Sequence, residues 1–219
     1  EPSRRQRQMC IRDRELGVPV LEEVNAPAMF RIGSRKAPHN LYADTELVRD
    51  VIDSKGYKFL QPGPQPLYPC GFDQNNWSTG ANKITIQYSD FTTVIWKMDG
   101  DRYSRFIIDA YSSEKDAVAH NFISQDGNYT DILSTETIVV IQGALYKDKA
   151  TTLPSILTVG IGDLYIFNDG KYVQGTWRRT DISESFEFFD INQNPIEVPP
   201  SSQWIHVVPN EGQIVWSNS

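Results

Sequence analysis

Beyond residue 82 the side chains alternate between apolar and polar, and this period of two constrains the fold more than any other feature. The alternation begins at Ile84, Ile86 and Tyr88, which are separated by polar residues, as in a half-buried strand. Further strand-like segments follow at 93–98, 103–108, 137–141, 156–167, 171–179, 185–190, 203–208 and 213–216. Turn residues recur at intervals of roughly 8–12 residues, which favours an antiparallel sheet arranged as a sandwich or as a barrel-like fold. We therefore predict about nine strands.

Local patterns refine this prediction. Asp99-Gly100 and Asp169-Gly170 each separate two strand patterns and predict tight hairpins. The segment 137–141 is continuously apolar and β-branched, which predicts a strand buried on both faces. His206 alternates with apolar neighbours, so we expect it on the wetter face of its strand. The polar interval 110–135 fits either a functional loop or a decorated strand pair, and the sequence leaves both open.

The part before residue 83 has a different character. Asp44 is a good N-cap for a helix at about 45–55, and Lys55 followed by Gly56 is a stop signal. The proline-rich run 61–69 excludes a helix or an interior strand. We predict an α+β, mainly β chain: residues 15–62 belong to an α/β part, 63–82 to a linker and 83–219 to a β-rich domain.

Residues 1–14 are unlike the rest. They contain five Arg and no apolar face, and they resemble the translated sequencing-adapter peptide found at broken ends of assembled reading frames. A native basic tail for nucleic acid or anionic lipid is the alternative. We set the run aside as non-native. The remaining 205 residues carry 16 basic and 26 acidic side chains, a net charge of −10, which disfavours nucleic-acid binding.

Several classes of site have no support in the sequence. Without Cys10, Cys70 stands alone and cannot form an internal disulfide. The three His are far apart, no zinc motif occurs, and no glycine-rich nucleotide loop or G-x-S-x-G turn is present. We therefore predict neither a metal nor a cofactor. No apolar run reaches the ~18–20 residues of a membrane span.

One loop is the main candidate for ligand binding. It precedes the predicted helix, and its guanidinium, ammonium and imidazole groups would suit a phosphate or a carboxylate near a positive helix end. The alternative is that its His and Asn satisfy backbone groups and lock the loop. The candidate anion-site residues are Arg35, Lys36, His39, Asn40 and Tyr42.

Four other residues are secondary candidates. Arg105 and His120 could meet in a polar cluster with Asp126 and Asp131, although a solvated loop is the simpler interpretation. Trp177 stands beside Arg178 at a hairpin end, where an exposed ring would stack on a sugar, although a core position is favoured. Trp96, Trp204 and Trp216 lie in strand alternation and are expected in the core.

Three motifs resemble the YerB-like lipoprotein family, which is built around a domain of unknown function. Residues 34–42 resemble its R-x-A-P-H-N-L-Y signature, residues 170–179 its G-K-x-x-x-G-T-W-x-K hairpin, and residues 200–209 its Trp-Ile-x-Val-Val-Pro ending. The resemblance covers about residues 15–217. It departs in two places: the family's G-x-x-H-x-D is loosened around His120, and serines at 201 and 202 replace a glycine before the terminal Trp strand.

The resemblance implies an N-terminal α/β domain and a β-rich C-terminal domain behind a lipoprotein signal. It therefore implies an extracytoplasmic, membrane-anchored parent, of which this chain is an N-terminally truncated fragment without the lipid-bearing Cys. Contact with membrane would come only through that anchor.

Two hypotheses of function follow, and whether the chain is an enzyme stays open. The first is a non-catalytic binding or assembly protein of the cell envelope with an unknown ligand. Its partner would be an anionic cell-wall polymer or another envelope protein. The alternative is a hydrolase or transferase acting on cell-wall polymer, with the His39 loop in its site.

Overall fold

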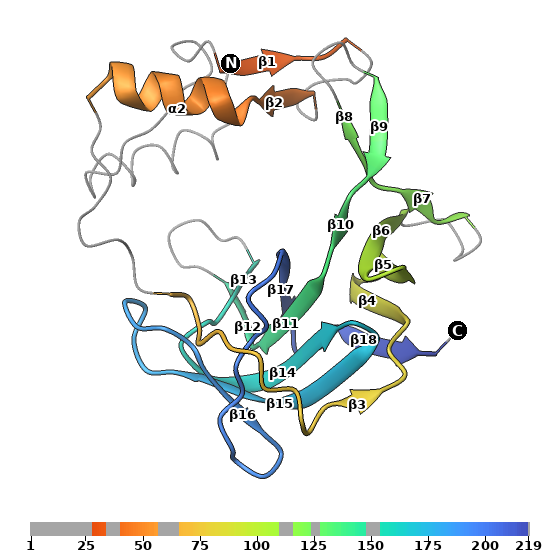
Figure 1. Ribbon diagram of the computed structural model, residues 1–219. Helices are drawn as coiled ribbons and strands as arrows, with labels where there is room; N and C mark the ends of the chain where they lie inside the picture. Colours follow the sequence, from red (N-terminus) through yellow and green to blue (C-terminus); the bar gives the residue numbers. More distant parts are fainter. Residues whose placement is uncertain are drawn as a thin grey trace. The chain divides into compact units, whose positions relative to one another are not determined.

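The computed structural model describes residues 28–33, 40–56, 66–109, 116–123, 128–147 and 154–218 (Figure 1). Its contacts divide the chain into two compact units. The first comprises Glu1–Pro64 and Ile123–Thr130, and the second Gln65–Phe122 and Asp131–Ser219. Residues 1–14 and Arg35, Lys36 and His39 of the predicted anion loop lie outside the described residues.

The first unit contains a strand pair followed by a helix. Strand β1 (Met29–Arg31) pairs antiparallel with β2 (Leu41–Ala43), and α2 (Thr45–Ser54) follows. The carboxylate of Asp44 accepts hydrogen bonds from the backbone nitrogens of Glu46 and Leu47, at 2.9 and 3.2 Å. These bonds satisfy donors that have no partner inside a first helical turn. The helix predicted at about 45–55 is confirmed, with the predicted cap.

The first sheet of the second unit has the strand order β10-β6-β5-β4-β18, with β7 added beside β6. In β4, Ile84 and Ile86 are buried and alternate with more exposed residues, as the sequence predicted, whereas β5 buries Val94, Ile95 and Trp96 in a row. Its strands are β4 (Lys83–Ser89), β5 (Thr92–Asp99), β6 (Arg102–Asp109), β7 (Val118–Ala119), β10 (Ser134–Thr135) and β18 (Gln213–Ser217).

The second sheet has the order β16-β15-β14-β11-β17, with β3 beside β15. Its strands are β3 (Ser78–Thr79), β11 (Thr137–Gly143), β14 (Gly160–Asn168), β15 (Lys171–Arg179), β16 (Glu187–Asp190) and β17 (Gln203–Pro209). Two short pairs stand apart from both sheets: β8 (Asn121–Ile123) with β9 (Tyr129–Ile132), and β12 (Leu145–Lys147) with β13 (Pro154–Ile156).

The mainly β class is confirmed, and eight of the nine predicted strands are present as single strands. The ninth, predicted at 156–167, is divided between β13, which ends at Ile156, and β14, which begins at Gly160. One pairing differs from the antiparallel prediction. Strand β17 lies parallel to β11, with Thr137 opposite Gln203 and Gly143 opposite Pro209. Parallel pairs need a long crossover, and here the chain between the two strands forms β14, β15 and β16 on the far side of β11.

The two sheets pack face to face over a shared apolar core, so the second unit is a sandwich of open sheets. Strand β11 has a core on each side: Ile138 and Val140 face the first sheet, whereas Val139 and Ile141 face away from it. Every residue of β11 is buried, which confirms the prediction for 137–141. The inter-sheet core contains Ala81, Ile84, Ile86, Val94, Trp96, Tyr103, Ile138, Val140, Phe167 and Val208.

The turns follow their sequence signals. Asn168 pairs with Lys171, and the two residues between them, Asp169 and Gly170, have φ of 49° and 68°. Positive φ at both positions defines the type I′ turn that matches the twist of a hairpin. Gly100, with φ of 65°, occupies the corresponding tight turn after Asp99.

Residues 66–82 differ from the linker that we predicted. Tyr68 is 3% exposed in the core, and its hydroxyl donates to Oε1 of Gln203 at 2.6 Å. Cys70 forms a β-bridge with Val198, and Ala81 is fully buried. The proline-rich composition correctly predicted that no long helix or strand forms here. It carries no information on whether an irregular segment packs against the core.

No helix in the described part of the chain is both long and apolar enough to cross a membrane.

Candidate functional site

Of the predicted anion loop, the structure describes only Asn40 and Tyr42. The Asn40 side chain accepts from Nη1 of Arg31 at 2.6 Å and donates to the Ile32 carbonyl at 3.2 Å. The ring of Tyr42 stacks on Phe30, with centroids 6.1 Å apart. Both side chains therefore stabilise the β1–β2 pair, as in the structural alternative for this loop.

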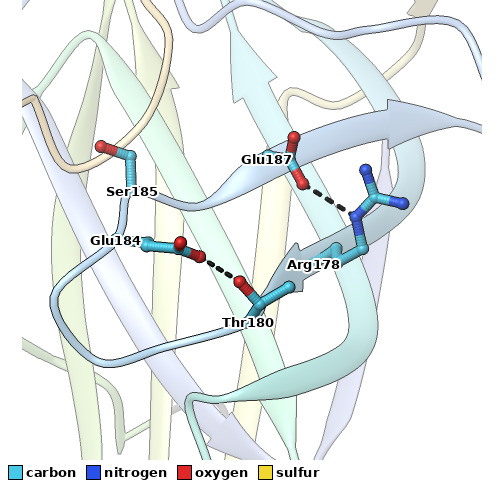
Figure 2. A pocket seen from close by; sticks show the side chains of 5 residues that line it. All are labelled: Arg178, Thr180, Glu184, Ser185 and Glu187. Atoms are coloured by element: carbon cyan, nitrogen blue, oxygen red, sulfur yellow. Dashed lines mark hydrogen bonds and ion pairs between the residues drawn. The ribbon is translucent and has the colours of Figure 1, made fainter.

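Arg178 lines an open hollow of about 460 Å³ at the start of the β15–β16 connection (Figure 2). Its Nε donates to Oε2 of Glu187 at 2.8 Å, and its guanidinium lies 4.9 Å from the Phe189 ring. This bond lowers the pKa of the Glu187 carboxyl. Thr180 donates to Glu184, and the Ser185 hydroxyl to the Pro66 carbonyl. The polar groups of the hollow already satisfy one another, which is typical of a solvated surface.

Trp177 is not a surface platform. Its ring is 1% exposed, packs edge-on against Phe186, and donates from Nε1 to the Gln142 carbonyl at 2.7 Å. A sugar cannot reach this ring, so Trp177 is corrected from candidate to core residue. The neighbouring arginine suggested a surface position, but successive residues of a strand face opposite sides.

Arg105 and His120 do meet. Arg105 lies where β6 changes partner: its nitrogen donates to the Leu133 carbonyl at 2.9 Å, and its carbonyl accepts from the His120 nitrogen, also at 2.9 Å. His120 therefore continues the β6–β7 pairing by one residue. This backbone arrangement brings Nη1 of Arg105 into a hydrogen bond with Nδ1 of His120. Asp131, proposed for the same cluster, is exposed, and Asp126 lies outside the described residues.

The Arg105 guanidinium lies among aromatic rings. Its central carbon is 4.9 Å from the Trp204 ring centroid and 5.8 Å from that of Trp96, within the range of cation–π attraction. Nε is buried and has no hydrogen-bond partner in the structure. Among the described residues, no carboxylate forms an ion pair with Arg105. Loss of hydration lowers the pKa of this half-buried group.

His206 completes the surroundings, and its position corrects our prediction. It is 1% exposed, whereas Ile205 and Val207 are each 37% exposed, so the histidine faces the core. Its Nε2 accepts from the Trp96 indole at 2.8 Å, and its Nδ1 bonds to the Tyr88 hydroxyl. Burial, followed by the charge of Arg105, lowers the pKa of His206 to about 3.

Tyr88 is the outermost member of this chain of hydrogen bonds. Burial raises its pKa to about 12, and the opposing effect of Arg105 is smaller, so the phenol stays protonated. We use the name Arg105 cluster for the six side chains that meet at this end of the inter-sheet core. They are Tyr88, Trp96, Arg105, His120, Trp204 and His206.

Sequence reasoning identified Arg105 and His120 and missed Tyr88 and His206 as site residues. Both lie in strand alternation, where they resemble ordinary core or surface positions. The sequence did contain a signal for His206. Residues i and i+2 of a strand share a face, and Trp204 was already assigned to the core, so His206 should have been assigned to the core as well.

The cluster has the chemistry of an anion site. A guanidinium presents its donors in a rigid fork that matches a carboxylate or phosphate, and surrounding rings raise the strength of such a contact by excluding water. Within the described ranges, no three His, Cys, Asp or Glu side chains gather as a metal-ligand set.

Comparison with known proteins agrees with this architecture. Residues 83–205 match the model of the C-terminal domain of a protein of unknown function, DUF3048. The crystal structure of the YerB protein from Bacillus subtilis superimposes with a TM-score of 0.66 at 16% identity, over 94% of this chain and 67% of the YerB chain. No curated protein matches the sequence. The match over residues 83–205 spans more than half of the chain, including β4 to β16 and the Arg105–His120 pair, and the chain therefore belongs to the DUF3048 family.

Proposed function

We propose that this chain is a non-catalytic binding module of the cell envelope that holds an anionic group at the Arg105 cluster. One observation carries the proposal: the Arg105 guanidinium is half-buried, keeps an unpartnered Nε, and has no ion-paired carboxylate among the described residues. An uncompensated cation in such surroundings is costly to the fold. An anionic ligand would compensate it.

The aromatic rings support binding over a purely structural role. Arg102, a partly exposed arginine of the same strand, is matched by Glu136 at 2.7 Å and by the Ser134 carbonyl at 3.2 Å. Arg105 has the imidazole of His120 and the faces of two rings instead. These neighbours orient the guanidinium without neutralising its charge.

We also propose that the protein is located in the cell envelope. This placement is supported by the resemblance of residues 34–42, 170–179 and 200–209 to motifs of the YerB-like lipoprotein family. It agrees with a partner that is an anionic cell-wall polymer or another envelope protein. The strongly acidic body would repel the bulk of such a polymer, so recognition would concentrate on the one basic point that the cluster offers.

Titration with simple anions tests the binding claim. We would follow the indole ¹H–¹⁵N signals of Trp96 and Trp204 while adding sodium acetate or sodium phosphate at constant ionic strength. We expect saturable shifts with a Kd on the order of millimolar, because one charge-assisted contact contributes only a few kcal/mol. Arg105→Gln should abolish the shifts.

Arg178→Gln is the matched control, because Arg178 is an exposed arginine already paired with Glu187. It should bind both anions as the unmodified protein does. Equal binding by the Arg105→Gln protein, with its fold intact by circular dichroism, would remove the proposed function.

The envelope placement has its own test. A full-length relative carrying a C-terminal epitope tag should be digested when protease is added to intact protoplasts. A tag that is protected until the cells are lysed would contradict the placement and leave the anion site unaffected.

A further inference from the structure

The hydrogen bonds of His206 fix the tautomer of its ring. An indole nitrogen can only donate, so the 2.8 Å contact from Trp96 makes Nε2 of His206 an acceptor. Burial keeps the ring neutral, with a pKa of about 3. A neutral imidazole carries one hydrogen, which must therefore sit on Nδ1. Nδ1 then donates to the Tyr88 oxygen.

This direction has a consequence for Tyr88. Its oxygen accepts from His206, so the hydroxyl hydrogen is not consumed by that contact and remains available to donate. Tyr88 is half-buried and keeps exposed surface. Tyr88 bonds to His206, and both His206 and the Arg105 guanidinium lie against the rings of Trp96 and Trp204, so the phenol and the guanidinium share one cluster. The cluster thus offers an O–H donor beside its N–H donors.

The charge of the cluster limits which anion it can hold. Within the part of the chain that the structure describes, Arg105 supplies the one permanent positive charge of the six side chains. A carboxylate brings a single negative charge, which this cation balances. A phosphate group carries about −1.5 to −2 near neutral pH, and the excess would be desolvated against Trp204 and Trp96 without compensation.

We propose that Tyr88, held by His206, is the second donor of the anion site, and that with Arg105 it selects a carboxylate over a phosphate. This inference rests on the proposed binding function and adds the class of ligand. Arg105 binds the anion directly, whereas Tyr88 adds a neutral hydrogen bond that needs no second charge. His206 is a positioning residue, because it acts through the orientation of the Tyr88 hydroxyl.

The first test is a set of titrations with acetate and phosphate on three proteins. The unmodified chain should bind acetate more tightly than phosphate. Tyr88→Phe removes the hydroxyl and keeps the ring, and it should weaken acetate binding about tenfold. Arg105→Gln should lose both anions.

The outcomes separate the two claims. Loss of binding in Arg105→Gln with unchanged acetate binding in Tyr88→Phe would overturn the inference and leave the proposed function standing. Unchanged binding in Arg105→Gln would overturn both. Phosphate binding as tight as acetate binding in the unmodified chain would overturn the carboxylate selectivity.

A second measurement does not depend on the folding of a variant. Long-range ¹H–¹⁵N correlation of the unmodified protein reports which ring nitrogen of His206 carries the hydrogen. We expect the Nδ1–H tautomer, unchanged on addition of acetate, together with an acetate-dependent shift of the Tyr88 ring carbon that bears the hydroxyl. The Nε2–H tautomer would reverse the direction of the Tyr88 bond and overturn the inference.

Discussion

The indole of Trp96 donates to Nε2 of His206 over 2.8 Å and so joins the two sheets of the sandwich by a buried hydrogen bond. Trp96 belongs to β5 of the first sheet and His206 to β17 of the second, and their exposed fractions are 0% and 1%. This buried hydrogen bond fixes how the two sheets align, because both of its groups would be unsatisfied if the sheets shifted past each other.

His206 should make the fold sensitive to mild acid. Its pKa is about 3 in the folded chain against an ordinary value of 6.5, so the unfolded state binds more protons between these pH values. The stabilisation is complete above pH 6.5 and decreases as the pH falls toward 3. From pH 6.5 to 4.5 this linkage predicts a loss of about 2–3 kcal/mol in the free energy of unfolding. Urea denaturation at pH 7 and pH 4.5 measures it.

His206→Gln is the control for this titration, because an amide can accept from Trp96 and donate to Tyr88 without taking up a proton. The variant should show a smaller difference between the two pH values, by about the predicted 2–3 kcal/mol. An identical acid dependence in both proteins would assign the loss to carboxylates and contradict the linkage.

Gly175 marks a second point where the fold depends on one residue. A Cβ built there would lie 1.8 Å from the Phe189 carbonyl oxygen of the neighbouring strand β16, and backbone cannot yield as a flexible side chain can. Gly175→Ala should therefore separate β15 from β16 and lower the free energy of unfolding by at least about 2 kcal/mol. Chemical denaturation gives the value.

The matched control is Gly33→Ala, because a Cβ at Gly33 meets no atom within 4 Å. This variant should change stability by less than about 0.5 kcal/mol, as ordinary surface substitutions do. Comparable losses in the two variants would show that the close approach of β15 and β16 does not limit stability.

Strands with one face against the core were predictable because their buried and exposed residues alternate. Ile84 and Ile86 of β4 are fully buried and alternate with more exposed residues, so burial produces a period of two in the sequence. The parallel pairing of β11 with β17 left no such signal. Thr137–Gly143 is buried throughout, and a strand buried on both faces reads the same whichever direction its neighbour runs.

The candidate site was predictable only in part. Arg105 and His120 were identified as possible members of a polar cluster because the interval 110–135 is rich in polar residues. Their contact depends on the backbone hydrogen bonds of Leu133 to both residues, and no local sequence pattern predicts these bonds. Tyr88 and His206 come from opposite sheets and are 118 positions apart, so their hydrogen bond is a property of how the sheets pack.

The N-cap of α2 gives a local prediction within the first unit. Asp44 accepts from the nitrogens of Glu46 and Leu47, and its charge also lies at the positive end of the helix. Asp44→Ala should reduce the stability of α2 by about 1 kcal/mol. Native-state hydrogen exchange over residues 45–54 measures this, and Asp50→Ala, in the middle of the same helix, is the control. Equal protection in the Asp44→Ala and Asp50→Ala proteins would mean that the cap contributes nothing.

Arg105 itself should lower the stability of the fold that carries it. Its guanidinium loses hydration, Nε gains no hydrogen bond, and no carboxylate among the described residues neutralises it. Replacing a buried charge by an apolar side chain of similar length is often neutral or stabilising. Arg105→Met should accordingly raise the free energy of unfolding by about 0.5–1 kcal/mol while eliminating acetate binding. A structural arginine would behave in the opposite way, so a loss of more than about 1 kcal/mol in urea denaturation would argue that Arg105 is kept for the fold and not for a ligand.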